Sequence, residues 1–433
     1  MKNNIRFDLS DYLIHFFRDV NLETGSHIYL PEHCGFNNQH HACFIDAKYL
    51  LRLSLRSHKI FSSWSYRNGQ RTVYGDSPVV CFTDMPIAAY LETGVRRLER
   101  NEKIGLYAIV LPKEQMFNYG ARPVIYGLDQ HNNARCSQGR NGERILDETA
   151  LPLIEQYRYV TYVPGKIDWT HEREWRWPYR GDINNFLNHI KEYGIPENIE
   201  STPGFDFRSS EISGAGIIVP FAEDIPTVAH DILTLIDRGV IGRNTFKFII
   251  AVESLQSWTQ LSEPGALLSC INDNTFEFES FFDLSASKVK NYADSINDYV
   301  SELYSKKDFL NDSYAMEFGN AWVWIHDNQS QVVRALLQAG MIKVNKEGRY
   351  LLDVNLASVD WPLRRKEAFA SHVAGWLKHR FDIEAGRYSV RGKDDYDAIP
   401  SYETPLKDQH PFYNHTVNVD WYLRKELTLL ALR

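Results

Sequence analysis

The stretch His171-Glu-Arg-Glu-Trp-Arg-Trp-Pro178 carries more information than any other part of the sequence. A β-strand places alternate side chains on opposite faces, so Glu172, Glu174 and Arg176 would share one face. Two carboxylates two residues apart, backed by an arginine, can stabilise the cation that develops when a glycosidic bond breaks. The alternative is a solvated strand face whose carboxylates pair with the arginines of the same stretch.

Two apolar elements upstream of this strand contain polar residues. Residues 9–20 form a short strand or helix in which His15 is flanked by apolar side chains. The run 77–83 is predicted as a buried strand because it is almost wholly apolar, and a helix then starts after Pro86 and carries Tyr90. His15 is either a hydrogen-bond donor to a ligand or a core histidine. Tyr90 is either a stacking ring or a core aromatic at helical spacing.

A third apolar segment, residues 120–127, is bounded by glycines and is predicted as a strand. Arg122 and Tyr126 are four residues apart, so a single strand would place them on one face. An arginine in that position can hold a pyrophosphate or another phosphate through two parallel hydrogen bonds, and the alternative is a surface arginine. Residues 127–142 are polar and lack periodicity, which predicts a mobile loop over the site.

The composition indicates a folded protein of two or three domains. The chain has 433 residues, of which 43% are hydrophobic and 24% charged. Five scattered cysteines are an odd number, which favours reduced thiols. The net charge of −8 means that nucleic acid could bind only through a local basic patch. No apolar run reaches the ~18 residues of a membrane span, and we predict a cytoplasmic protein without a membrane partner.

The pattern of elements predicts an α+β fold in two domains. Residues 1–256 are rich in strands, including 104–111, 216–220 and 246–252, and contain a clear amphipathic helix at 46–57. Residues 257–433 form a second, mixed α/β domain. This second domain opens with a helix at 285–304 and has another at about 362–381, with a hairpin-like segment at 344–352. The border lies where the periodicity fades and turn residues increase.

Other signals compete with the glycosidic chemistry. A segment with two cysteines and three histidines has enough nitrogen and sulfur ligands for zinc, but its spacing matches no standard zinc finger, so no metal site is predicted: His33, Cys34, His40, His41, Cys43. The chain has no Gly-x-Ser-x-Gly elbow, no phosphate-binding loop and no Gly-x-Gly-x-x-Gly fingerprint. A hydrolase triad and a Rossmann domain are therefore unsupported.

The order of a histidine element, a strand–helix corner with a tyrosine, and a glutamate strand resembles the His-Tyr-Glu order of the diphtheria-toxin-like ADP-ribosyltransferase superfamily. The run Val80-Cys-Phe-Thr-Asp-Met85 with Tyr90 is similar to the Tyr-Phe-Ala-Asp-Met…Tyr corner of poly-ADP-ribose polymerases. The chain departs from that corner at Cys81, which occupies the first tyrosine position of the family. Glu172-x-Glu174 resembles the Glu-x-Glu of transferases that modify arginine or nucleic acid.

This resemblance implies a split β-sandwich with helices, in which NAD lies in a cleft between two small sheets. Glu174 would stabilise the ribosyl cation, and Glu172 would activate the acceptor. His15 would donate to the adenosine ribose or to the nicotinamide amide, and Tyr90 would stack on the nicotinamide ring. The residues assigned to NAD binding come from three of the predicted elements: His15, Cys81, Phe82, Thr83, Tyr90, Arg122 and Tyr126.

Residues 10–255 look closest to bacterial abortive-infection proteins of the AbiGi type, which are related to DarT-like transferases and to mRNA-modifying phage-defence toxins. This similarity implies transfer of ADP-ribose to a nucleic-acid base, with RNA favoured over DNA, by a toxin that an antitoxin protein restrains. The second domain resembles a bacterial domain of unknown function through motifs such as Gly348-Arg-Tyr-Leu-Leu352.

Three alternatives to a nucleic-acid transferase stay open. The first is a transferase that modifies protein. The second is a catalytically silent module that acts as a sensor or antitoxin. The third is a metal-dependent hydrolase that uses the His33–Cys43 segment.

Overall fold

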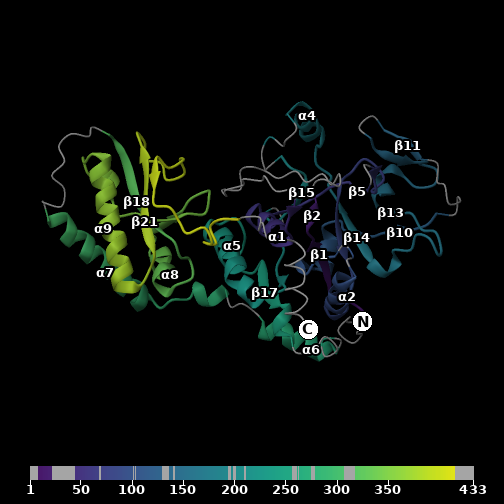
Figure 1. Ribbon diagram of the computed structural model, residues 1–433, viewed down its shortest axis with the longest axis horizontal. Helices are drawn as coiled ribbons and strands as arrows, with labels where there is room; N and C mark the ends of the chain where they lie inside the picture. Colours follow the sequence, from purple (N-terminus) through teal and green to yellow (C-terminus); the bar gives the residue numbers. More distant parts are fainter. Residues whose placement is uncertain are drawn as a thin grey trace. The chain divides into compact units, whose positions relative to one another are not determined.

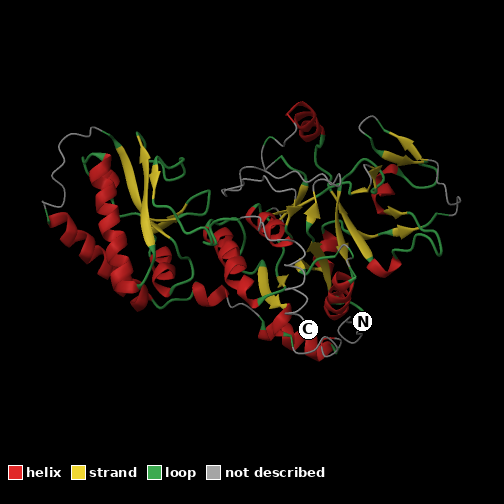
Figure 2. Cartoon of the chain, in the orientation of Figure 1, coloured by secondary structure: helices red, strands yellow, loops and turns green. Residues whose placement is uncertain are grey.

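A computed structural model describes residues 8–21, 44–67, 70–100, 102, 104–128, 136–139, 142–193, 197, 201–208, 211–255, 261, 263–274, 278–306 and 317–414. These ranges contain both helices and strands, with runs of consecutive strands in the N-terminal part, which confirms the α+β class (Figures 1 and 2). A search of the described helices for one that could cross a membrane found none.

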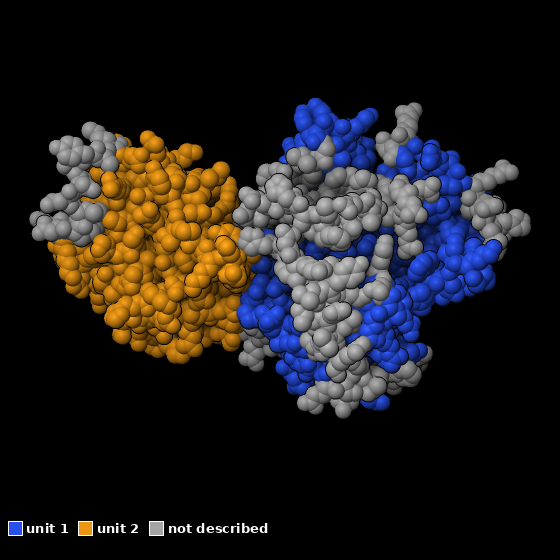
Figure 3. Space-filling model, viewed as in Figure 1, with its two compact units in different colours: residues 1–229, 244–276, 414–433 blue, residues 230–243, 277–413 orange. Residues whose placement is uncertain are grey.

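The chain divides into two compact units (Figure 3). Unit 1 comprises residues 1–229, 244–276 and 414–433, and unit 2 comprises residues 230–243 and 277–413. The sequence predicts a single border after residue 256, whereas the contacts place a first division within helix α5 (Ile225–Asp237). The C-terminal half of α5 therefore belongs to unit 2.

Unit 1 is built on a seven-stranded sheet in the order β17-β16-β8-β1-β7-β14-β9. The strands come from widely separated parts of the unit: β1 Tyr12–Phe17, β7 Val79–Thr83, β8 Tyr107–Pro112, β9 Arg122–Pro123, β14 Glu174–Pro178, β16 Ala215–Val219 and β17 Phe246–Ala251. Residues 9–20, which the sequence left open between strand and helix, thus contain a strand.

The sheet is weakly joined at its centre. β1 pairs with β8 at six positions and β7 pairs with β14 at five. Between β1 and β7, all of whose residues are described, one position pairs, with Ile14 opposite Thr83. Beside it the imidazole Nδ1 of His15 lies 2.8 Å from the carbonyl oxygen of Cys81. A side chain therefore bridges the two strands where a backbone ladder would continue, and the sheet consists of two half-sheets.

Helices α2 (Ile87–Glu99) and α6 (Pro264–Asp273) cover one face of the larger half-sheet. Their apolar side chains pack on buried residues of four strands: Ile14, Ala108, Val110, Ile218, Phe248 and Ile250. Helix α1 (Ala47–Arg56) packs against β1 and β8 and begins where the Asp46 carboxylate accepts from the Tyr49 N–H at 2.8 Å. These contacts make the larger half-sheet the core of unit 1.

Shorter elements surround the sheet. Five two-stranded pairs are β2 (Val20–Asn21) with β3 (Phe44–Ile45), β4 (Lys59–Phe61) with β15 (Gly204–Asp206), β5 (Tyr66–Arg67) with β6 (Gln70–Arg71), β10 (Ile125–Tyr126) with β13 (Tyr159–Val160), and β11 (Cys136–Gln138) with β12 (Arg144–Leu146). Helices α3 (Lys113–Asn118) and α4 (Asn184–Tyr193) and the 3₁₀ segment Leu153–Arg158 complete the unit.

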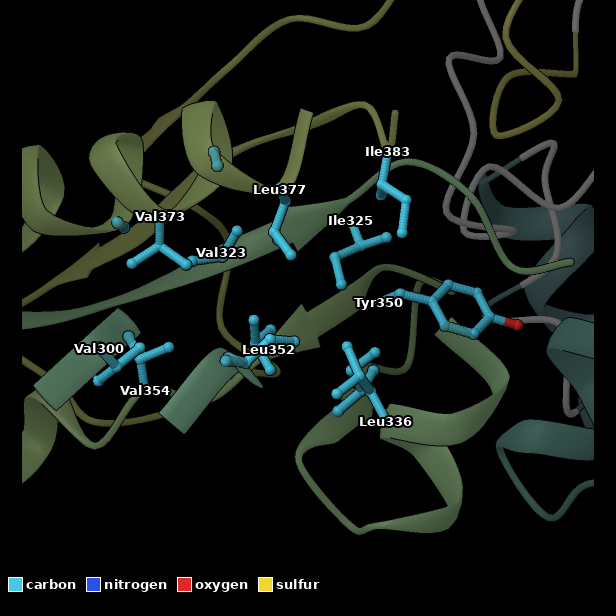
Figure 4. Packing of buried hydrophobic residues seen from close by; sticks show 14 of the residues in the cluster. Val300, Val323, Ile325, Leu336, Tyr350, Leu352, Val354, Val373, Leu377 and Ile383 are labelled. Atoms are coloured by element: carbon cyan, nitrogen blue, oxygen red, sulfur yellow. The ribbon is translucent and has the colours of Figure 1, made fainter. Parts of the chain in front are cut away.

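In its described residues, unit 2 contains a five-stranded sheet, the end of α5 and three further α-helices. Its strand order is β19-β20-β18-β21-β22, with bounds Ile342–Val344, Tyr350–Leu352, Gly319–Ile325, Ala385–Arg391 and Tyr402–Glu403. Helices α7 (Ala286–Ser305), α8 (Gln331–Gln338) and α9 (Leu363–Phe381) pack on one face, where side chains such as Val323, Leu352 and Val373 interlock (Figure 4). The other face buries a separate aromatic cluster that includes Trp322, Trp324 and Tyr388.

A buried ion pair explains why the end of α5 belongs to unit 2. The Arg334 guanidinium of α8 donates to both carboxylate oxygens of Asp237, at 2.6 and 2.7 Å. The Tyr350 hydroxyl, which points away from the other labelled side chains in Figure 4, donates to the same carboxylate at 2.7 Å. Because each partner is charged or polar and almost wholly buried, none could leave the others without a large desolvation cost.

Candidate functional site

The strand that carries the candidate carboxylate begins at Glu174. Residues Thr170–Glu172 form a 3₁₀ turn, and Arg173 has a left-handed backbone with φ 47°. The predicted strand across 171–173 is therefore wrong. The physical reason lies at the end of β7, where the Thr83 hydroxyl donates to the Glu172 carbonyl at 2.7 Å and the Asp84 N–H donates to the Arg173 carbonyl at 3.0 Å. These bonds turn the chain before the ladder starts.

Glu174 and Arg176 share one face of the sheet, as their spacing predicts. Arg176 Nε donates to Glu174 Oε1 at 2.7 Å. Arg176 Nη1 donates to the carbonyls of Tyr157 and Tyr159, at 2.6 and 3.2 Å. The arginine side chain is 5% exposed and the glutamate side chain is 20% exposed. A buried, backbone-anchored guanidinium thus fixes a carboxylate that still reaches the surface.

Cys81 lies on the same face, directly opposite Arg176. Burial raises the pKa of the Cys81 thiol, the nearby Glu174 charge raises it further, and Arg176 opposes both effects. The thiol is therefore protonated at neutral pH and is no nucleophile. Thr83, opposite Glu174, is also buried, and its hydroxyl is occupied by the Glu172 carbonyl. Both residues shape the surroundings of Glu174.

Glu172 is held by a different partner. Its Oε1 accepts from Arg97 Nη1 of α2 at 2.7 Å and lies 3.4 Å from His171 Nε2. Arg97 also donates to Glu102 at 2.7 Å, so one guanidinium bridges two carboxylates. The Glu172 side chain is 19% exposed. Glu172 thus lies beside β14 rather than on it, and Arg97 sets its orientation.

Tyr126 lies close to both candidate carboxylates. Its hydroxyl donates to the Trp169 carbonyl at 3.1 Å. Burial raises the pKa of the Tyr126 phenol, a hydrogen bond with the Glu174 backbone lowers it, and the charges of Glu174 and Glu172 raise it. The charges of Glu172 and Glu174 thus both act on the pKa of the Tyr126 phenol, although the two residues occupy different elements.

Arg122 and Tyr126 do not share a strand, so that prediction is wrong. The chain forms β9 at Arg122–Pro123 and β10 at Ile125–Tyr126, and these belong to different sheets. The switch occurs because the Val124 N–H donates to the Glu174 carbonyl at 3.0 Å, while the next two residues pair with β13. Arg122 remains beside the site, opposite Arg176 in the ladder.

His15 and Phe82 lie on the other face of the sheet. Ile14 pairs with Thr83, and the adjacent positions His15 and Phe82 therefore turn away from the face of Glu174. Their rings contact each other with centroids 5.9 Å apart. Burial lowers the pKa of His15 to about 4, with the bond to the Cys81 carbonyl acting in the opposite direction. His15 is thus a neutral imidazole that bridges two strands.

Tyr90 lies in the core of unit 1. Its side chain has no exposed area, and its hydroxyl donates to the Gly105 carbonyl at 2.5 Å. The ring contacts Phe16 at 6.1 Å between centroids, and burial raises the pKa of the phenol. Of the two interpretations of Tyr90, the structure supports the core aromatic and not the stacking ring, because neither face of the ring is accessible to a ligand.

Sequence reasoning offered Arg176 as a partner of the carboxylates but missed the pairing of Glu172 with Arg97 and the carbonyls that anchor Arg176. Arg97 is 75 residues from Glu172 and has the appearance of a solvated helix position. The carbonyls of Tyr157 and Tyr159, which anchor Arg176, belong to a segment without any motif. The one available signal was the pattern Glu174-x-Arg176, whose spacing puts an arginine beside a carboxylate.

Two predicted features fall wholly or partly outside the described residues. The His33–Cys43 segment lies outside them, and the loop 127–142 is described at 127–128, 136–139 and 142. Among the parts of the chain that are described, no three His, Cys, Asp or Glu side chains come together as a metal site requires.

Comparison with known protein families gives a match in the C-terminal part of the chain. Residues 284–415 match the model of a family described as "Protein of unknown function (DUF4427)". This segment lies almost wholly in unit 2 and contains the motifs that resemble a domain of unknown function. No curated protein and no solved structure matches the chain.

Proposed function

We propose that unit 1 is a mono-ADP-ribosyltransferase that uses Glu174 as its catalytic carboxylate. The observation that carries this proposal is the ion pair between the partly exposed Glu174 and the buried Arg176 at the start of β14, where Glu174 pairs with Thr83, the β7 residue at the junction of the two half-sheets. The junction is consistent with the split sheet of the superfamily. A carboxylate of fixed orientation next to such a junction is suited to stabilise a ribosyl cation.

The reaction breaks the bond between the nicotinamide nitrogen and C1′ of the ribose in NAD. The electron pair of that bond leaves with nicotinamide, and Glu174 stabilises the positive charge that develops on the ribose. An acceptor nitrogen or oxygen then forms the new bond to C1′ and gives up its proton, which Glu172 accepts. Arg97 keeps the Glu172 carboxylate in place through Oε1, and both carboxylates act near the Tyr126 phenol.

The acceptor in this proposal is a nucleic-acid base, in RNA rather than DNA. The biological setting is phage defence, in which an antitoxin protein restrains the toxin. This choice rests on the motif resemblance in residues 10–255, and the arginine residues near Glu174 supply the local positive charge that a chain of net charge −8 needs for such a partner.

A catalytically silent transferase fold is the second candidate, and specific observations favour it. Each carboxylate is already paired, Glu174 with Arg176 and Glu172 with Arg97. Tyr90 lies in the core, and His15 faces away from Glu174. In this alternative unit 1 would act as a sensor or an antitoxin through its surface alone.

Transfer of label from NAD distinguishes the two candidates. Purified protein is incubated with NAD labelled in its adenylate part and, separately, with total RNA, DNA and cell lysate. We expect label in the RNA pool with the wild type, and a loss of about 100-fold or more with Glu174→Gln, which keeps the size of the side chain but not its charge. Glu92→Gln on the surface of α2 is the matched control and should leave transfer unchanged.

The outcome also names the acceptor class. Label in lysate protein alone would support a protein-modifying transferase. An absence of transfer and of NAD cleavage, together with an absence of NAD binding by calorimetry, would contradict the transferase and leave the silent module as the better account.

A further inference from the structure

Arginine residues gather along the open edge of the seven-stranded sheet. β9 is the last strand in the sheet order, and its Arg122 lies opposite Arg176 of β14. By this register Arg122 starts on the Glu174 face, and its guanidinium ends against Phe117, whose ring contacts Trp175 of the opposite face, so the side chain lies at the edge itself. Arg158 reaches the same edge, where its Nε donates to the Pro123 carbonyl at 3.0 Å.

A third arginine, Arg180, completes this group, which we call the arginine edge: Arg122, Arg158 and Arg180. Its guanidinium lies 5.2 Å from the centre of the Tyr157 ring. Burial and the Glu155 charge raise the pKa of the Tyr157 phenol, while all three arginine charges oppose that rise. The contacts place the three arginines together: Arg158 follows Tyr157 in the chain, Arg180 lies over the Tyr157 ring, and Arg122 lies opposite Arg176, which donates to the Tyr157 carbonyl.

The positive charge of the arginine edge is only partly neutralised. Arg158 pairs with Glu155 at 2.7 Å. No ion pair joins Arg122 or Arg180 to a carboxylate in the described ranges of the chain. Backbone carbonyls hold these two, with Arg122 Nη1 bonded to Phe117 O at 2.6 Å and Arg180 Nη2 bonded to Ile154 O at 2.9 Å. Such bonds orient a guanidinium without cancelling its charge.

An exposed aromatic ring adjoins the edge. Phe117 is 46% exposed, and the Arg122 guanidinium lies 3.9 Å from its ring centre. The Trp175 ring contacts Phe117 at 6.5 Å between centroids, at an angle of 70°. A large apolar ring left in solvent beside fixed cations offers a stacking surface next to anion-binding groups.

We propose that the arginine edge binds the sugar–phosphate backbone of a single-stranded nucleic acid, with Phe117 stacking on one of its bases. Guanidinium forks match phosphate oxygens, and base stacking on an exposed ring requires unpaired bases. An acidic peptide would use the arginines but not the ring. The proposal rests on the transferase function above, because Arg122 lies opposite Arg176, the ion-pair partner of Glu174.

Equilibrium binding of fluorescent oligonucleotides in the absence of NAD tests this surface. Single-stranded RNA and DNA of the same sequence, and the corresponding duplex, are titrated with the full-length protein over a range of salt concentrations. We expect Arg122→Gln/Arg158→Gln/Arg180→Gln to weaken single-strand binding by about 10-fold or more and to lower the salt slope by about 2, since each phosphate contact contributes about 0.7. Phe117→Ala should weaken binding at every salt concentration without changing the slope.

Matched controls separate the edge from general charge and from folding. Arg96→Gln/Lys191→Gln/Lys247→Gln removes the same charge from exposed positions elsewhere in unit 1 and should bind like the wild type. Arg180→Gln alone, at an exposed position, gives a smaller loss in the same direction if the triple variant does not fold. The ratio of RNA to DNA affinity then shows which strand the edge prefers.

Three results would overturn the inference. The triple variant could bind single strands as tightly as the wild type, the control variant could lose as much affinity as the triple variant, or the wild type could bind no oligonucleotide. Each of these outcomes leaves NAD cleavage and its dependence on Glu174 untouched. Conversely, binding that needs the arginine edge in a protein that never cleaves NAD would support the surface and contradict the transferase.

Discussion

A buried arginine pairs with a carboxylate in each unit, Arg334 with Asp237 in unit 2 and Arg176 with Glu174 in unit 1, and these two pairs differ in how complete they are. In unit 2 the side chains of Arg334 and Asp237 are 2% and 5% exposed, and both carboxylate oxygens accept from the guanidinium. In unit 1 Arg176 is equally buried, but Glu174 is 20% exposed and accepts from Arg176 through Oε1. A closed pair of the first kind supports a fold. A half-open pair of the second kind leaves a carboxylate fixed in direction and accessible.

The largest effect is expected when the closed pair is broken. Asp237→Ala leaves the Arg334 guanidinium buried without its anion and removes the acceptor of the Tyr350 hydroxyl, which should destabilise unit 2 by about 3–5 kcal/mol. Chemical denaturation followed by tryptophan fluorescence measures the loss, since Trp322 and Trp324 lie in this unit. The control is Glu302→Ala on α7, where a 61% exposed glutamate pairs with Lys306 and should matter little. Equal stability of the two variants would contradict a supporting role for the closed pair.

Acidification tests one partly buried histidine in each unit. The pKa of His15 in unit 1 and that of His326 in unit 2 are both lowered to about 4, chiefly by burial. Below pH 6.5 the unfolded chain binds a proton that the folded chain does not, so stability falls as the pH drops from about 6.5 to about 4. The total loss is at most about 3 kcal/mol for each histidine, given 1.36 kcal/mol per pKa unit.

Thermal unfolding between pH 4 and 7 measures this dependence. His15→Gln should flatten the acid slope of unit 1, and His326→Gln that of unit 2. His379→Gln, at an exposed position at the end of α9, is the control and should leave both slopes as in the wild type. Unchanged slopes in the first two variants would show that other groups cause the acid sensitivity.

The sequence predicts elements well where their signals are local. The predicted helix 285–304 is α7, Ala286–Ser305, because a serine cap and helical periodicity lie within one short window. The buried strand 77–83 is β7, and the helix 46–57 is α1. In each case neighbouring residues alone decide the structure.

Predictions failed where distant residues decide the backbone. The strand from 171 is interrupted because Thr83 and Asp84, about 90 residues away, bond to the carbonyls of Glu172 and Arg173. The predicted strand 120–127 is divided because the Val124 N–H donates to the Glu174 carbonyl, while the next two residues pair with β13. The alternation of side chains along a strand predicts that Glu174 and Arg176 share one face. It does not predict the position of Glu172, which lies in the turn before the strand.

The smallest effect is expected from a conservative substitution in the half-open pair of Glu174 and Arg176. Arg176→Lys keeps the positive charge, but an ammonium cannot bond Glu174 and the Tyr157 and Tyr159 carbonyls with the geometry of a guanidinium. We expect a stability loss of about 1–2 kcal/mol and a kcat for NAD cleavage that is lower by about 10-fold, with KM for NAD nearly unchanged. This split identifies Arg176 as a positioning residue, because a merely structural loss would lower the amount of active enzyme and leave the turnover of the folded fraction unchanged. Steady-state kinetics, normalised to folded protein, measure it, and Arg96→Lys at a 67% exposed position is the control. An unchanged kcat would mean that Glu174 needs no fixed direction, and the two pairs would then differ in exposure alone.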